Sequence, residues 1–126
     1  MSEQPPPNRY RIFGISNCDT MKKALAWLAE HRVAVDFVDY RKTAISVEQL
    51  ADWSRRVSWQ VLLNTRGTTW RRLAEEQRAD LDENRALTLM AAQPSLIKRP
   101  VIDTGDALLI GFDAQRYANE FLGTKP

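Results

Sequence analysis

The first third of the chain shows two different spacings of hydrophobic residues. Residues 10–15 and 33–40 are short runs rich in β-branched and aromatic residues, and we predict a strand for each. Residues 20–31 instead carry apolar side chains at positions i, i+3, i+4 and i+7, which predicts a helix with one buried face. Strand, helix and strand in this order predict a βαβ unit.

The middle of the chain is predicted to be helical. Ser46 begins a capping-box pattern, and the apolar residues that follow it repeat at helical spacing. Asp82 marks the start of another helix, which Pro94 ends. Between these helices, Gly and Thr residues around Gly67 indicate a loop that leads into a short helix. We expect these segments to form a helical insertion at about residues 46–94.

Two apolar runs near the C-terminus, residues 100–103 and 107–110, flank a Thr-Gly-Asp turn. This pattern predicts a β-hairpin with antiparallel strands. Asp113 is a residue of the N-cap type, and the helix that we expect after it ends at Gly123. The apolar face of that helix is predicted to hold Ala114, Tyr117, Ala118, Phe121 and Leu122. A βαβ half followed by a ββα half predicts an α/β fold of the thioredoxin-like kind, with a four-stranded mixed sheet and the helical insertion.

Length and composition favour a single domain. With 126 residues, of which 44% are hydrophobic, the chain can bury one core, and we expect this domain to span residues 9–123. Residues 1–8 are polar and proline-rich, which predicts a disordered leader without the features of a secretory signal. The net charge of +2 is not that of a nucleic-acid binder, and no apolar run is long enough to span a membrane. We therefore expect neither nucleic acid nor a membrane as a partner.

The chain contains one cysteine, Cys18, and one histidine, His31. A single cysteine excludes an internal disulfide and a multi-cysteine zinc site, and a single histidine excludes a His-rich site, so we expect no metal. We also expect no tightly bound cofactor. His31 lies about 19 Å from Cys18 along the predicted helix, too far to act as the base of the thiol, and we expect it to cap the helix end. A free thiol without an export signal indicates the reducing cytoplasm.

Cys18 lies where the first predicted helix begins. There it meets unpaired backbone N–H groups and the positive end of the helix dipole, which favour the thiolate. Ser16 and Asn17 can offer hydrogen bonds, and the ammonium group of Lys22 lies one turn further on, whereas Asp19 opposes the effect. The alternative is that Cys18 is a small buried hydrophobic residue, as most free cysteines are. We favour a reactive thiol because Cys18 follows a polar turn and lies off the apolar face of the helix.

A reactive Cys18 would work as a monothiol, because Met21 stands where a Cys-x-x-Cys motif has its second cysteine. The abundant external thiol of the cytoplasm is glutathione, whose carboxylates require cationic or N–H partners. Arg99 is one candidate, since the following Pro100 holds it in an extended conformation. Arg66, in a glycine-containing loop, is another. For each arginine the plain alternative is a solvated surface charge.

Three segments together resemble a known family. They are the sequences I-S-N-C at residues 15–18, L-L-N-T-R-G at 62–67 and I-K-R-P-V-I at 97–102. They resemble the arsenate reductase ArsC family, and within it the YffB-like branch, which is related to the Spx regulators. The resemblance runs from about residue 10 to residue 123. It implies a thioredoxin-like domain with a helical insertion.

The resemblance also implies roles for individual residues. It makes Cys18 the nucleophile and places Pro100, in the cis form, opposite the thiol. Arsenate reductases of this family attack arsenate with the cysteine, exchange with glutathione and are completed by glutaredoxin. Of the arginines that the family brings to the oxyanion, Arg99 has a match here, whereas the other two positions align with Asn64 and Gly111. The loss of charge-assisted donors weakens oxyanion binding and favours a disulfide substrate over arsenate.

Three functions follow from these observations. The first is a glutathione-dependent thiol/disulfide reductase that uses Cys18 as its single nucleophile and glutathione as its co-substrate. The second is an arsenate reductase coupled to glutaredoxin, in which Arg99 and Arg66 suffice to hold the anion. The third is a non-enzymatic regulator that binds RNA polymerase as Spx does, ranked last because Met21 replaces the second cysteine of the Spx switch. The predicted glutathione-binding residues are Arg99, Pro100, Arg66, Asn17 and Lys22.

Overall fold

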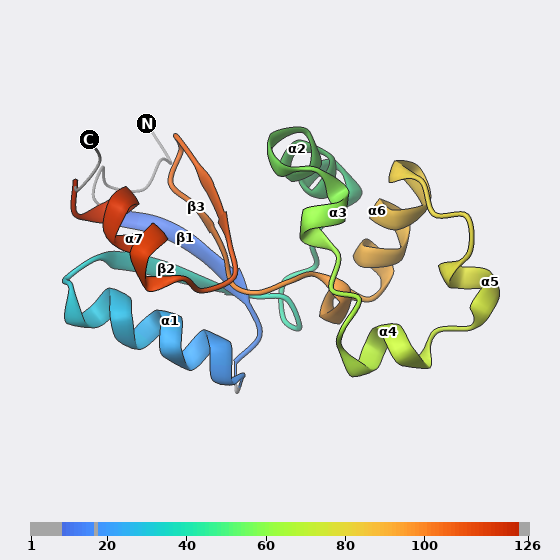
Figure 1. The fold of residues 1–126 in the computed structure, drawn as a ribbon, viewed down its shortest axis with the longest axis horizontal. Helices are drawn as coiled ribbons and strands as arrows, with labels where there is room; N and C mark the ends of the chain where they lie inside the picture. The colour runs from blue at the N-terminus through green and yellow to red at the C-terminus, as the bar shows by residue number, and fades with distance from the viewer. Residues whose placement is uncertain (1–8, 17, 124–126) are drawn as a thin grey trace. The chain divides into compact units, whose positions relative to one another are not determined.

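The computed structural model describes residues 9–16 and 18–123, which form two compact units (Figure 1). The sheet unit comprises the described residues up to Asp39 and those from Arg99 onward, and the helical unit is Tyr40–Lys98. The predicted insertion, at about residues 46–94, falls within the helical unit. The predicted disordered leader, residues 1–8, lies outside the described residues.

The sheet unit is built on four strands in the order β2-β1-β3-β4. Strand β1 (Arg9–Gly14) pairs in parallel with β2 (Ala34–Asp39) and antiparallel with β3 (Val101–Asp103). Strand β4 (Leu108–Ile110) pairs antiparallel with β3 and completes the predicted hairpin. The prediction of a mixed four-stranded sheet is confirmed.

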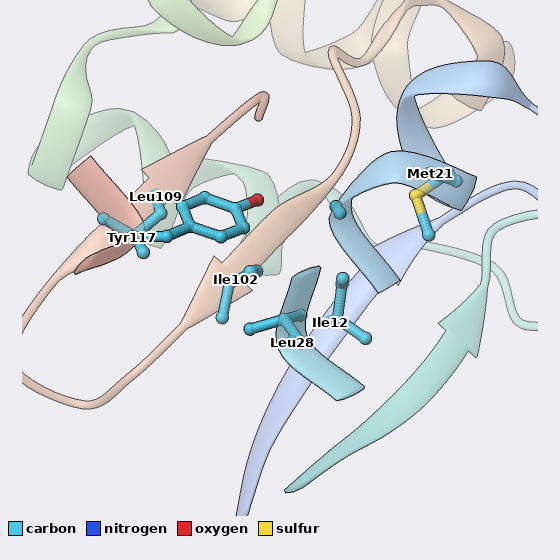
Figure 2. Close-up of a cluster of buried hydrophobic side chains, with 7 residues drawn as sticks. Ile12, Met21, Leu28, Ile102, Leu109 and Tyr117 are labelled. Atoms are coloured by element: carbon cyan, nitrogen blue, oxygen red, sulfur yellow. The ribbon is translucent and has the colours of Figure 1, made fainter. Parts of the chain in front are cut away.

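Two helices, α1 (Asp19–Glu30) and α7 (Ala114–Phe121), pack against one face of this sheet. Strand residues in register with one another project toward them and form a core with side chains of both helices (Figure 2). The buried members of this core cluster are Ile12, Met21, Ala24, Leu28, Ile102, Leu109 and Tyr117. The burial of many apolar side chains against one sheet face supplies the main stabilisation of the unit.

Helix α7 begins as predicted, because the Asp113 side chain accepts a hydrogen bond from the backbone N–H of Arg116 at 3.1 Å. Its predicted apolar face is only partly correct. Tyr117 is buried, but Ala114 is exposed, and Leu122 lies beyond the end of the helix and is 45% exposed. The spacing of apolar residues does not show how much of a helix the rest of the protein covers, which explains the errors at both ends of α7.

His31 ends α1 as its C-cap residue. Its Nδ1 lies 2.8 Å from the carbonyl oxygen of Trp27, and the two rings stack with their centroids 3.9 Å apart. The expectation that His31 is a helix-end cap is therefore confirmed.

The helical unit contains six short helices. They are α2 (Val47–Val57), α3 (Trp59–Leu62), α4 (Thr68–Arg72), α5 (Glu75–Arg78), α6 (Glu83–Ala92) and the 3₁₀ helix η1 (Pro94–Leu96). The Ser46 and Asp82 side chains accept hydrogen bonds from backbone N–H groups in the first turns of α2 and α6, as predicted. Within the described part of the chain, no helix combines the length and the apolar character that a membrane crossing requires.

A partly buried hydrogen bond joins the two longest helices of this unit. The hydroxyl of Ser54, 6% exposed on α2, donates to Glu83 Oε2 on α6 at 2.6 Å. We expect Ser54→Ala to lower the free energy of unfolding by about 1–2 kcal/mol, because the Glu83 carboxylate loses a donor. Urea denaturation followed by circular dichroism measures this loss. Thr88→Ala, on the exposed side of α6, is the control, and an equal loss in both variants would contradict the prediction.

Candidate active site

Cys18 occupies the N-cap position of α1. Its backbone is extended, with φ −126° and ψ 133°, and its carbonyl accepts the first helical hydrogen bond from the N–H of Lys22 at 2.9 Å. The side chain is half-buried and packs against the core cluster. The expectation that Cys18 lies off the apolar face was therefore wrong. The reason is helical geometry, since Cys18 and the buried Met21 are three residues apart and share one side of the helix.

Opposing effects set the pKa of the Cys18 thiol. Its partial burial is the largest single effect and raises the pKa. The backbone N–H groups of Met21 and Thr20 and the side chain of Arg99 favour the thiolate and lower the pKa, and together with the positive charge of Arg99 they outweigh burial. The pKa of Cys18 is therefore lowered below the usual value for a thiol. Because the thiolate is the nucleophile, this environment activates the sulfur.

The Arg99–Pro100 peptide at the entrance to β3 brings Arg99 to the thiol. The peptide bond is cis, which confirms the expectation that the resemblance carried. Pro100 is buried, and its carbonyl accepts a hydrogen bond from the N–H of Gly111 at 2.8 Å. The half-buried Arg99 side chain is close enough to the Cys18 sulfur to lower the pKa of the thiol. Two residues far apart in the sequence thus form one site in the sheet unit.

The other predicted site residues take different places. Asn17 lies outside the described residues. Lys22 has an exposed side chain. Its ammonium group is not among the described groups that shift the pKa of Cys18. Ser16 lies near Asp39, with its Oγ 3.5 Å from Asp39 Oδ2. Arg66 belongs to the helical unit, where its side chain is exposed and its backbone N–H donates to Asn64 Oδ1 at 3.0 Å.

Gly111 shows a structural feature that sequence analysis did not anticipate. Its φ is +79°, in the left-handed region that glycine adopts without strain and other residues rarely do. It lies next to the site through its hydrogen bond to Pro100. An arginine would be strained in this backbone conformation. This is consistent with glycine standing here, at the position where the resembled family has an arginine. The signal in the sequence for this backbone conformation was a glycine directly after a predicted strand.

Among the residues that the structure describes, no group of three or more His, Cys, Asp or Glu side chains is placed to hold a metal ion.

Comparison with known proteins places this site in a family. The family model that matches is the ArsC family, over residues 13–119. An uncharacterized protein of Haemophilus influenzae is 43% identical to this chain, over 87% of this chain and 96% of its own length.

Two solved structures show the same fold. A YFFB protein is 53% identical, with a TM-score of 0.85 over 87% of this chain and 96% of its own. An arsenate reductase (ArsC) related protein from Brucella melitensis is 42% identical, with a TM-score of 0.73 over 94% of this chain and 98% of its own. The observed sheet and the fold of these structures confirm the thioredoxin-like fold class. On the match to its family model and these relatives, this chain is a member of the ArsC family.

Proposed function

We propose that this protein is a glutathione-dependent thiol/disulfide reductase with Cys18 as its single nucleophile. Membership of the ArsC family supports a thiol redox function in general. The observation that carries the finer proposal is the activated Cys18 thiol, held at a helix start against Arg99 with Met21 at the position of a second cysteine. Because the protein has no second cysteine, a disulfide formed between Cys18 and a substrate has to be resolved by an external thiol.

The proposed reaction has two exchange steps. In the first, the Cys18 thiolate attacks the glutathione sulfur of a mixed disulfide, R–S–S–glutathione. A Cys18–glutathione disulfide forms, and the substrate leaves as its thiolate. In the second, the thiolate of another glutathione attacks the glutathione sulfur of that adduct, which yields oxidised glutathione and restores Cys18. The proton of the incoming glutathione ends on the released thiol. One disulfide is reduced and one formed, so the electrons balance.

Arg99 has a part in both steps of this mechanism. In the resting protein its guanidinium stabilises the negative charge of the Cys18 thiolate. When Cys18 forms a disulfide, that negative charge leaves the sulfur, and the guanidinium becomes available to a carboxylate of glutathione. We keep Pro100, Asn17, Lys22 and Arg66 as glutathione-binding residues predicted from sequence. The proposal also assumes a reducing compartment such as the cytoplasm, where glutathione is abundant.

Arsenate reduction is a second candidate, supported by Arg99. The guanidinium of Arg99 and the N–H groups at the start of α1, which favour the thiolate, would also favour a bound oxyanion. In that mechanism glutathione releases the arsenic product and glutaredoxin reduces the glutathione adduct. Glycine at position 111 leaves this site with fewer cationic groups for the anion, so we rank arsenate second. We rank a regulator that binds RNA polymerase third.

A direct comparison of substrates tests the proposal. Purified protein is supplied with glutathione and either a peptide–glutathione mixed disulfide or arsenate, with and without glutaredoxin, and the formation of oxidised glutathione is measured. We expect turnover of the mixed disulfide without glutaredoxin, and mass spectrometry should show one glutathione on Cys18 as the intermediate. Turnover of arsenate alone would favour the second candidate. No adduct and no turnover of either substrate would exclude both.

A further inference from the structure

Gly14, the last residue of β1, lies against the side chain of Met21 in the first turns of α1. A Cβ atom on Gly14 would overlap Met21 Sδ and lie 2.9 Å from its Cε and 3.3 Å from its Cγ. Met21 is 1% exposed and belongs to the core cluster, so its side chain has little room to move aside. A larger residue in place of Gly14 would therefore push the start of α1 away from the sheet.

The start of α1 is also the part of the helix that holds the thiol. Cys18 is its N-cap residue, and the backbone N–H groups of Thr20 and Met21 lower the pKa of its thiol. Figure 2 shows Met21 and Leu28 projecting from different turns of α1 into the same cluster. A shift of the first turn would move the sulfur together with these two N–H groups, whereas a change at Leu28 acts two turns away.

Arg99 reaches the thiol from the sheet rather than from α1. It lies two residues before Val101, which pairs with Phe13, the neighbour of Gly14 on β1. The distance between the sulfur and the guanidinium thus depends on how closely the start of α1 approaches the end of β1. The Gly14–Met21 contact is made at this point.

We propose that Gly14 and Met21 are positioning residues whose contact holds the Cys18 sulfur of α1 against the guanidinium that enters with β3. This inference deepens the proposed function, on which it rests for its biological meaning. It concerns the reactivity of the thiol itself, however, and can be tested without any disulfide substrate.

The test is a cycle of three variants: Gly14→Ala, Met21→Ala and the double variant. Gly14→Ala pushes the helix start outward, and Met21→Ala removes the side chain that fixes it. We expect each single variant to lower the rate of Cys18 alkylation by iodoacetamide at neutral pH by about three- to tenfold, because less thiolate is present. In the double variant the new methyl group occupies part of the space left by Met21, so the loss should be smaller than the two single losses combined.

Leu28→Ala is the matched control, since it removes another buried side chain from the same helix and cluster. We expect it to lower Tm while the alkylation rate stays within about twofold of the wild type. The proposal would be overturned if Gly14→Ala and Met21→Ala also lowered Tm but left the alkylation rate unchanged. If Gly14→Ala does not fold, Met21→Ala and the double variant decide by the same comparison.

The outcome is independent of the assay for the proposed function. A wild-type protein that fails to turn over mixed disulfides can still show the expected loss of alkylation in the single variants. Conversely, if the protein reduces mixed disulfides but its alkylation rate is unchanged by substitutions at Gly14 and Met21, the proposed function stands and the positioning role is refuted.

Discussion

Cys18→Ser should abolish the glutathione adduct and lower the turnover of a mixed disulfide by at least about a thousand-fold. A serine hydroxyl stays protonated at neutral pH and does not exchange with disulfides, whereas the environment of Cys18 lowers the pKa of its thiol. Because the chain has one cysteine, no other thiol can replace it. Mass spectrometry after exposure to oxidised glutathione and the rate of oxidised glutathione formation measure the two effects.

The control for this variant is Lys23→Ala, an exposed residue on the same helix that has no part in the proposed site. We expect it to keep turnover within about twofold of the wild type, as a surface substitution away from the thiol should. Circular dichroism should show both variants folded. Turnover that survives in Cys18→Ser would place the reaction elsewhere and end the proposal of a thiol mechanism.

The elements with local signals were predictable from the sequence. Ser46, Asp82 and Asp113 each begin a helix as expected, because an N-cap depends on residues within one turn. The hairpin of β3 and β4 was equally local, with Gly105 at φ +90° in its turn. The four-residue helices α3 and α5 were not predicted, since one turn of helix is too short to show a hydrophobic period.

The site was predictable in its parts but not in its geometry. Cys18 at a helix start and Arg99 before Pro100 are both visible in the sequence. Their contact depends on the antiparallel register of β1 and β3, which no local pattern reports. The packing of Cys18 on the core depends in the same way on the approach of α1 to the sheet. The isomer of the peptide before Pro100 was available only through the family resemblance.

Arg99→Gln should raise the pKa of the Cys18 thiol and slow the turnover of a mixed disulfide. The variant keeps a hydrogen-bond donor but loses the positive charge beside the sulfur, so burial of Cys18 weighs more heavily and the pKa of the thiol should rise. The pH profile of alkylation should therefore move to higher pH. At neutral pH we expect the turnover of a mixed disulfide to fall by about ten- to a hundredfold.

Two further variants show whether the charge or the planar fork of the arginine matters. Arg99→Lys keeps the charge, so it should restore most of the alkylation profile, but a single ammonium cannot form the bidentate contact that a guanidinium makes with a carboxylate. If Arg99 also binds glutathione, Arg99→Lys should raise the KM for glutathione while its thiol stays reactive. Lys98→Gln, which removes the neighbouring exposed charge, should change neither quantity. An unchanged alkylation profile in Arg99→Gln would mean that the helix N–H groups alone activate the thiol, and Arg99 would lose its place in the mechanism.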